Sequence, residues 1–86
     1  MPTPAQALRD IRGYAAAGRI EYTTHALEEM AEAQATFADV RAALTRATRA
    51  VLQANGRWKV RGPDRAGDEL VLVVVLDAGV LVVTVF

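Results

Sequence analysis

Residues 69–86 decide the fold: they read Glu-Leu-Val-Leu-Val-Val-Val-Leu over 69–76, Asp-Ala-Gly over 77–79 and Val-Leu-Val-Val-Thr-Val-Phe over 80–86. Branched aliphatic residues at nearly every position favour strands. The three-residue link contains a glycine, which is typical of a turn. Because so short a link joins antiparallel neighbours, we expect an antiparallel hairpin here.

A second strand pair precedes this hairpin. The sequence predicts a strand over 51–54, a two-residue Asn55-Gly56 turn and a strand from Arg57 to Gly62. Asn-Gly is the strongest short hairpin signal because both residues tolerate positive φ angles. Residues 63–67, rich in Pro, Asp and Gly, form a loop. Together these segments predict a four-stranded antiparallel meander.

Helices are expected before the strands. Thr3-Pro4-Ala5-Gln6 has the residues of a capping box and starts a helix from Pro4 to Ala17, which Gly18 ends. Thr23 or Thr24 caps a second helix. A third helix runs from the Thr36 cap to about Arg49. The fold class is therefore α+β: two to three N-terminal helices followed by the meander, in one domain over residues 1–86.

Helical spacing also predicts which side chains are buried. In the second helix the inward residues are Leu27 and Met30. The stripes of the first and third helices are Leu8, Ile11, Tyr14 and Ala15, and Phe37, Val40, Leu44 and Ala47.

Composition narrows the class of protein. The 86 residues have zero net charge, no cysteine and one histidine. The missing cysteines exclude disulfides, Fe–S clusters and thiolate zinc sites, and one histidine makes a transition-metal site unexpected. The longest apolar run, 70–76, is too short for a membrane-spanning helix. No signal-peptide pattern is present, so a cytoplasmic domain without a membrane partner is expected.

The neutral total conceals a basic segment. Residues 41–65 contain seven Lys and Arg side chains against one acid. Such a segment suits an anion-binding face, although arginines that only solvate a helix give the same pattern.

Alternation in the strand over 57–62 separates two kinds of side chain. Trp58 and Val60 share one face, which should pack on the helices, and Arg57, Lys59 and Arg61 share the other. Three cations in a row suit a phosphodiester, since Arg offers a planar fork and Lys a compact charge. Cations that protect an edge strand from aggregation are the equally weighted alternative.

The last two strands are apolar on both faces. Val80 and Val82 share one face of the final strand, and Leu81, Val83 and Val85 share the other. Because three short helices cover only one face of the sheet, the other needs cover. We therefore expect a homodimer or a complex with a partner, through the sheet face or through the open edge of the last strand. The alternative is a sheet that curls and buries its own second face.

His25 is the one side chain whose unperturbed pKa lies near neutrality. It is expected in the first turn of the second helix, where the helix dipole favours the neutral ring. A neutral imidazole is able to act as a general base. A structural hydrogen-bonding role is the alternative.

Three stretches resemble a known family. Residues 17–30, with Thr23, His25, Ala26 and Met30, resemble the T-x-H-A-x-x-x-M signature of small bacterial domains related to the MqsR and RelE toxins. Residues 55–64 resemble the basic second strand of that family, and residues 67–70 and 82–86 resemble its last two strands. The resemblance covers nearly the whole chain.

The resemblance implies a barnase/EndoU/colicin/RelE-like fold and a toxin–antitoxin setting. Its members are metal-independent endoribonucleases that act on free or ribosome-bound mRNA, need no cofactor and are neutralised by an antitoxin protein. Transferred residue by residue, it makes His25 and Lys59 the catalytic candidates. The substrate-binding candidates are Arg57, Arg61, Tyr22 and Thr84. A non-catalytic binding or dimerisation module of the same fold is the alternative.

Overall fold

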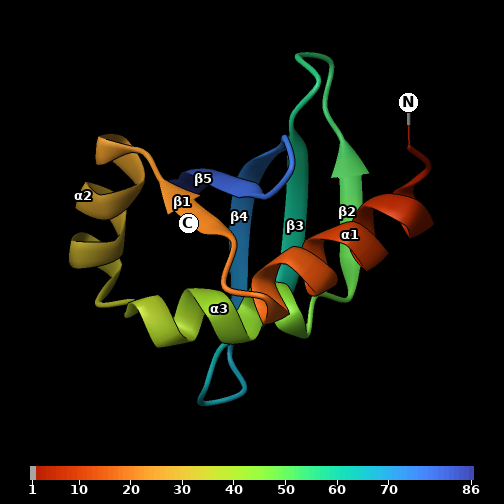
Figure 1. Ribbon diagram of the computed structural model, residues 1–86. Coiled ribbons are helices and arrows are strands. Elements are labelled where there is room, and N and C mark those ends of the chain that lie inside the picture. The colour runs from red at the N-terminus through yellow and green to blue at the C-terminus, as the bar shows by residue number, and fades with distance from the viewer. Residues whose placement is uncertain (1) are drawn as a thin grey trace.

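The computed structural model describes residues 2–86 as three helices and a five-stranded sheet (Figure 1). The elements are α1 (Pro4–Ala16), β1 (Ile20–Tyr22), α2 (Thr24–Ala33), α3 (Phe37–Thr45), β2 (Arg49–Leu52), β3 (Trp58–Pro63), β4 (Glu69–Leu76) and β5 (Val80–Val85). This confirms the α+β class. Within residues 2–86, none of the helices has the length and apolar character that crossing a membrane requires.

The sheet has the order β1-β5-β4-β3-β2 and is mixed rather than antiparallel throughout. The β2–β3–β4–β5 meander forms with antiparallel pairs as expected. The four-strand count is wrong because Ile20–Tyr22 adds a fifth strand, parallel to Val80–Val82. A three-residue segment carries too weak a periodic signal to reveal a partner sixty positions away.

The added strand changes which edges are open. β5 lies inside the sheet, between β4 and β1. Beyond the end of β1, α2 and its N-cap lie along the same edge of β5. The Thr23 hydroxyl donates to the carbonyl of Val83, and the backbone N–H of Val85 donates to Glu29. The expectation that the last strand has an open edge is therefore wrong, because β1 and α2 lie along that edge.

Local sequence accounts for the helix ends. The capping box between Thr3 and Gln6 is present at the start of α1, and Gly18 adopts the expected left-handed φ of 77° after its end. Thr23 is the N-cap of α2. α3 ends at Thr45, four residues earlier than expected, because 49–52 pairs with β3 as a strand. The expected strand over 51–54 accordingly begins and ends two residues earlier.

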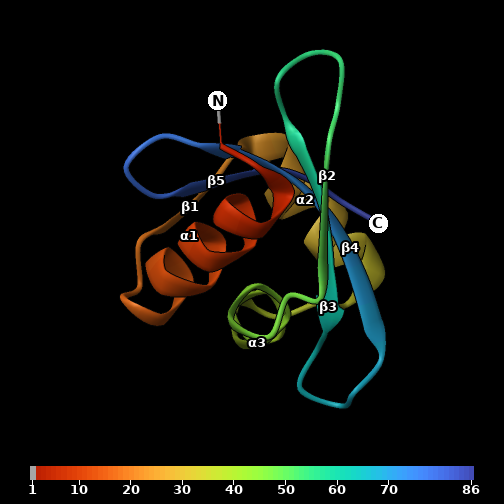
Figure 2. The ribbon, with the colours of Figure 1, turned by 90° about the vertical axis from the view of Figure 1, so that its right-hand side faces the viewer.

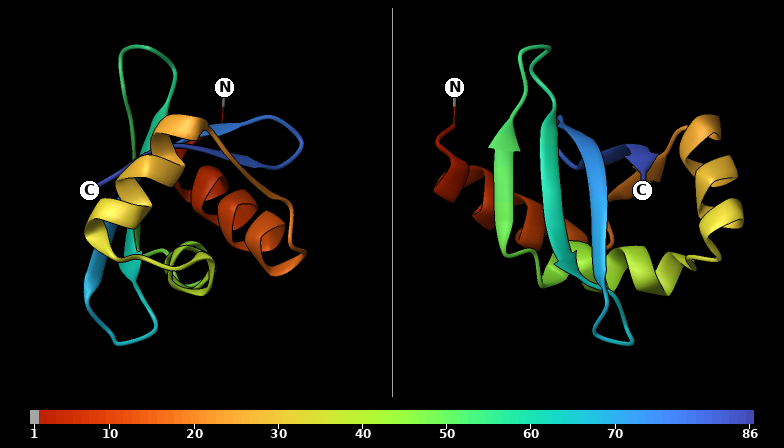
Figure 3. Two further views of the ribbon diagram at one scale, coloured as in Figure 1. Left: turned by 90° about the vertical axis from the view of Figure 1, so that its left-hand side faces the viewer. Right: turned by 180° about the vertical axis from the view of Figure 1, so that it is seen from behind.

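α1 and α3 pack on one face of the β2–β3–β4 part of the sheet, as the edge-on view shows (Figure 2). Trp58 and Val60 point into this layer and are buried, as alternation predicted. Ile11 of α1 and Leu44 of α3 meet them in the core. The opposite face of β2, β3 and β4 has no helix over it, and α2 flanks it (Figure 3, right). We call it the open face.

Two residues expected in the core are exposed. Leu27 is 42% exposed because α2 turns Ala26, Glu29 and Met30 toward β5. One residue along a helix is a turn of about 100°, so Leu27 leaves that face. Phe37, 59% exposed, is the first residue of α3 and packs its ring edge-on against Tyr22, with the centroids 4.9 Å apart.

A β-bulge in β5 reverses which side chains point to the core after Val82. Val74 pairs with Val82 and Val73 pairs with Thr84, so Val83 is the extra residue. Val85 therefore joins Val80 and Val82 on the core face and is buried, contrary to the alternation expected for the strand.

The apolar side chains on the open face of β4 are only partly exposed to solvent. Val73 lies on it yet is buried within the single chain, and Val71 and Val75 are half-buried. The sheet thus covers part of its second face itself. The hydrophobic cost that favoured a partner on this face is correspondingly smaller.

The β2–β3 turn differs from the two-residue form. Gln53 N–H donates to the carbonyl of Arg57, and Gly56 N–H donates to that of Gln53. Only Gly56 has a positive φ, at 81°, whereas Asn55 does not. The loop is thus the three-residue kind, in which a glycine in the left-handed region follows a turn.

Asp39 links the start of α3 to the 64–68 loop. Its Oδ2 accepts from the backbone N–H and hydroxyl of Thr36, and its Oδ1 accepts from the backbone N–H of Arg65. The backbone bond from Thr36, followed by that from its hydroxyl, lowers the pKa of Asp39 from its usual value. The ionised form therefore stabilises the native state.

Asp39→Ala is expected to lower the urea midpoint at pH 7. A carboxyl whose pKa is lowered by folding contributes stability above its unfolded pKa of about 4, and loses it as the pH falls through its folded pKa. The difference between wild type and variant should therefore shrink in acid. Urea titrations at neutral and acidic pH measure it, with the exposed Asp68→Ala as control. An equal difference at both pH values would contradict the assignment.

Candidate functional site

Strand pairing places two rows of side chains across the open face. The first row is Val51, Lys59, Val73 and Thr84. The second is Arg49, Arg61, Val71 and Phe86, whose N–H donates to the carbonyl of Val71. Paired residues on neighbouring strands share a face, about 5 Å apart. Lys59, Arg61 and Thr84 are thus brought together on the open face, and Phe86 joins them.

Lys59 lies half-buried at the centre of this face. Its Nζ is 5.7 Å from the centroid of the Phe86 ring, a cation–π distance. Phe86 is itself 63% exposed. The ammonium and the aromatic ring therefore form one surface patch.

The two arginine candidates differ in their surroundings. The guanidinium of Arg61 pairs with Glu69, with Nη1 and Oε1 3.2 Å apart and both side chains substantially exposed. Such exposed pairs contribute about 0–1 kcal/mol, so an incoming phosphate would compete with a weak partner. Arg57 is exposed and directly precedes β3, its backbone N–H donating to the Asn55 side chain.

His25 lies on α2, in the first turn after the Thr23 cap. Thr23 ties that turn to the sheet: its hydroxyl accepts from Ala26 N–H and donates to the Val83 carbonyl, and its own N–H donates to Val82. The His25 side chain is 66% exposed. The imidazole is therefore open to solvent on a turn that is held against β5.

Glu29, one turn along α2, contacts both His25 and the sheet. Its Oε1 is 3.3 Å from Nε2 of His25 and accepts the backbone N–H of Val85 at 3.0 Å. Val85 directly precedes Phe86, over whose ring Lys59 lies. His25 is thus linked through Glu29 to Val85, and Lys59 contacts the ring of the next residue, Phe86, from β3.

Tyr22 does not join these residues. It pairs with the buried Val82 and packs against the core, on the face opposite Lys59. Its neighbour there is the Phe37 ring. Burial raises the pKa of the Tyr22 hydroxyl.

Two members of the arrangement, Glu29 and Phe86, are not among the site residues expected from the sequence. Glu29 had a signal, since His25 and Glu29 stand four residues apart, on one side of a helix. Phe86 had none, because its place on the open face depends on the bulge at Val83.

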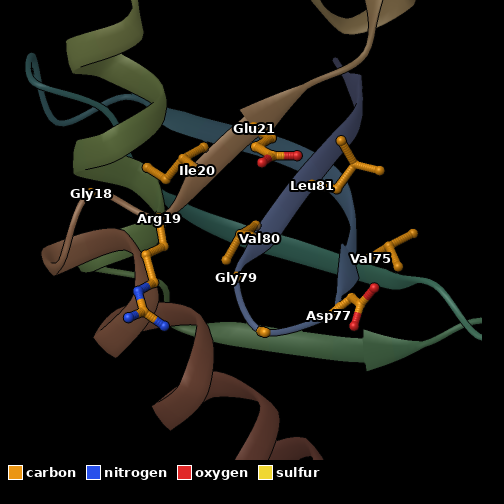
Figure 4. Close-up of a pocket in the computed structure, with 10 residues that line it drawn as sticks. Gly18, Arg19, Ile20, Glu21, Val75, Asp77, Gly79, Val80 and Leu81 are labelled. Atoms are coloured by element: carbon orange, nitrogen blue, oxygen red, sulfur yellow. The ribbon is translucent and has the colours of Figure 1, made fainter.

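A hollow in the surface lies away from these residues. It measures about 390 Å³ and is bordered by the start of β1 and the β4–β5 turn, with Arg19, Glu21, Asp77 and Leu81 among its lining residues (Figure 4). Neither His25 nor Lys59 borders it. Among residues 2–86, no group of three or more His, Asp or Glu side chains is placed to hold a metal ion.

Comparison with known proteins assigns the chain to no family. No family model matches it, and neither a curated protein nor a solved structure is significantly similar to it. Its function is therefore inferred from the arrangement of its own residues.

Proposed function

We propose that the chain is a metal-independent endoribonuclease, acting as the toxin of a type II toxin–antitoxin system. One observation carries the proposal: at the end of β5, Val85 is bonded to Glu29 beside His25, and the next residue, Phe86, has its ring under Lys59, which shares the open face with Arg61. The resemblance of residues 17–30 and 55–64 to the MqsR and RelE toxins points the same way. The contacts and the resemblance both involve His25, Lys59 and Arg61.

The chemistry requires a base, a cation and an acid. His25 takes the proton of a ribose 2′-OH, and the 2′-oxygen then forms a bond to the adjacent phosphorus. Lys59 stabilises the extra negative charge of the phosphorane and donates a proton to the departing 5′-oxygen as the P–O5′ bond breaks. The products are a 2′,3′-cyclic phosphate and a 5′-hydroxyl, with no oxidant or further reactant consumed.

The surrounding side chains suit a single strand. Arg57 and Arg61 provide guanidinium groups for neighbouring phosphates. The exposed Phe86 ring beside them offers a surface on which an unpaired base stacks. Thr84, two strands from Lys59 in the same row, provides a hydroxyl near the reacting phosphate.

Partners follow from this proposal. They are RNA, including ribosome-bound mRNA, and an antitoxin protein that neutralises the enzyme in the cytoplasm. A second copy of the chain is a further candidate, because Leu27, Phe37 and Val51 leave large apolar side chains exposed.

Purified protein is expected to cleave single-stranded RNA in excess EDTA or, in magnesium-containing buffer, mRNA bound to ribosomes. A DNA strand of the same sequence should stay intact because it lacks the attacking 2′-OH. Gel analysis of labelled strands measures cleavage, and mass spectrometry identifies the cyclic phosphate. Equal cleavage of DNA, or a product with a 3′-hydroxyl, would contradict the mechanism.

The second candidate function is a binding module without catalysis, favoured by the same exposed apolar side chains. The cleavage assay separates the two. Intact RNA after incubation with and without ribosomes would leave the binding module as the supported function.

A further inference from the structure

Glu29 is held more firmly than the other acids of α2. Its side chain is 22% exposed, and its Oε1 accepts the backbone N–H of Val85 at 3.0 Å. Glu28 and Glu32 on the same helix are exposed. A carboxylate fixed against a strand, 3.3 Å from an imidazole nitrogen, is placed to control that imidazole.

We propose that Glu29 is a positioning residue that holds His25 through Nε2–H and leaves Nδ1 as the nitrogen that accepts the substrate proton. This inference rests on the proposed function. An ionised carboxylate only accepts hydrogen bonds, so the nitrogen facing it carries the proton. In a neutral imidazole the other nitrogen then has the free lone pair.

The same contact assists the reaction step. When Nδ1 accepts the 2′-OH proton the ring becomes positively charged, and the carboxylate on its opposite side stabilises that charge. This is the task of the carboxylate in catalytic triads, which holds the tautomer without itself taking the proton.

The Glu29 carboxylate has little freedom to move away. The Val85 N–H holds its Oε1, and the Thr23 side chain fixes the start of α2 to β5. His25 therefore presents its ring from a backbone and a partner that are both anchored to the sheet. A misplacement of about 1 Å in such a group costs about 10²-fold in rate.

Three variants separate the contributions of Glu29. Glu29→Ala removes the carboxylate that accepts the Val85 N–H and lies 3.3 Å from Nε2 of His25. Glu29→Gln keeps an oxygen for Val85 N–H and Nε2–H but removes the charge. Glu28→Ala removes a neighbouring exposed acid and is the matched control. Circular dichroism melts show whether each variant folds.

Nitrogen-15 NMR tests the ring directly, because His25 is the one histidine of the chain. At a pH where the ring is neutral, wild type, Glu29→Gln and Glu28→Ala should show an Nε2-bound proton that exchanges slowly enough to be observed. Glu29→Ala should lose it. A wild-type ring protonated on Nδ1, or an Nε2 proton unaffected by Glu29→Ala, would overturn the inference.

Kinetics supply the second readout. Glu29→Ala should lower kcat by about 10²-fold with KM unchanged, since orientation matters only in the reacting complex. Glu29→Gln should recover the part of the loss that comes from orientation, and its remaining deficit measures the stabilisation of the imidazolium by the charge. Equal kcat values for Glu29→Ala and Glu28→Ala would overturn the inference. RNA left intact by wild type overturns the proposed enzyme instead, and the NMR result still decides whether Glu29 fixes the ring.

Discussion

Gly62→Ala is expected to destabilise the protein by about 3 kcal/mol or more. Gly62 lies on β3 beneath α3, where an added Cβ would overlap the carbonyl oxygen of Ala43 and approach the Cα of Ala47 to 3.1 Å. These are backbone atoms, so no side-chain rotation relieves the overlap. The helix would have to move away from the sheet and open the core around Leu44.

Gly13→Ala is the control for this variant. Gly13 lies within α1 and has no atom within 4 Å of an added Cβ. An alanine there should stabilise the helix by about 0.5–1 kcal/mol. Urea unfolding of both variants gives the free energies. A Gly62→Ala protein as stable as wild type would show that α3 does not approach β3 this closely.

The Gly62 contact also shows where sequence reasoning stops. The strand around Gly62 is visible in the alternation of Trp58 and Val60, which predicted the buried face correctly. The need for glycine is not visible, because it arises from a helix that crosses the strand. Local patterns report propensity and facing, whereas close approach is a property of tertiary packing.

The strands show the same difference between what local sequence predicts and what tertiary packing decides. The run over 69–76 has the predicted bounds because eight residues of strand-forming type lie between two turns. The sequence predicts no sheet strand at Ile20–Tyr22, since the pairing of this segment with Val80–Val82 depends on how the chain folds back. Val85 was assigned to the wrong face because a bulge leaves no clear mark in an unbroken apolar run.

In the candidate site, too, some residues were placed correctly from the sequence and others were not. Lys59 and Arg61 were placed on one face by alternation, and strand pairing agrees. Tyr22 lies on the other face because β1 follows the alternation of β5, a strand to which it was not expected to pair. The roles of these residues in catalysis stay predictions, since residue placement alone does not show an activity.

His25→Ala is expected to lower the rate of RNA cleavage by about 10²–10⁴-fold, the usual cost of losing a general base. Lys59→Gln should also cause a large loss, because in the proposed mechanism its ammonium stabilises the developing charge and supplies the leaving-group proton. The control for a lost cation is Arg46→Ala, an exposed side chain after α3. Initial rates with folded proteins measure the effect. Wild-type rates in both variants would remove these two residues from the mechanism.

The pH dependence of cleavage identifies the base. Protonation removes the imidazole lone pair that accepts the 2′-OH proton, so the wild-type rate should fall as the solution becomes more acidic. The residual rate of His25→Ala should lack this dependence. A wild-type rate that is constant between about pH 5 and 8 would instead assign His25 a structural role, such as steadying the Glu29 carboxylate that binds Val85, and leave catalysis to the cations of the open face.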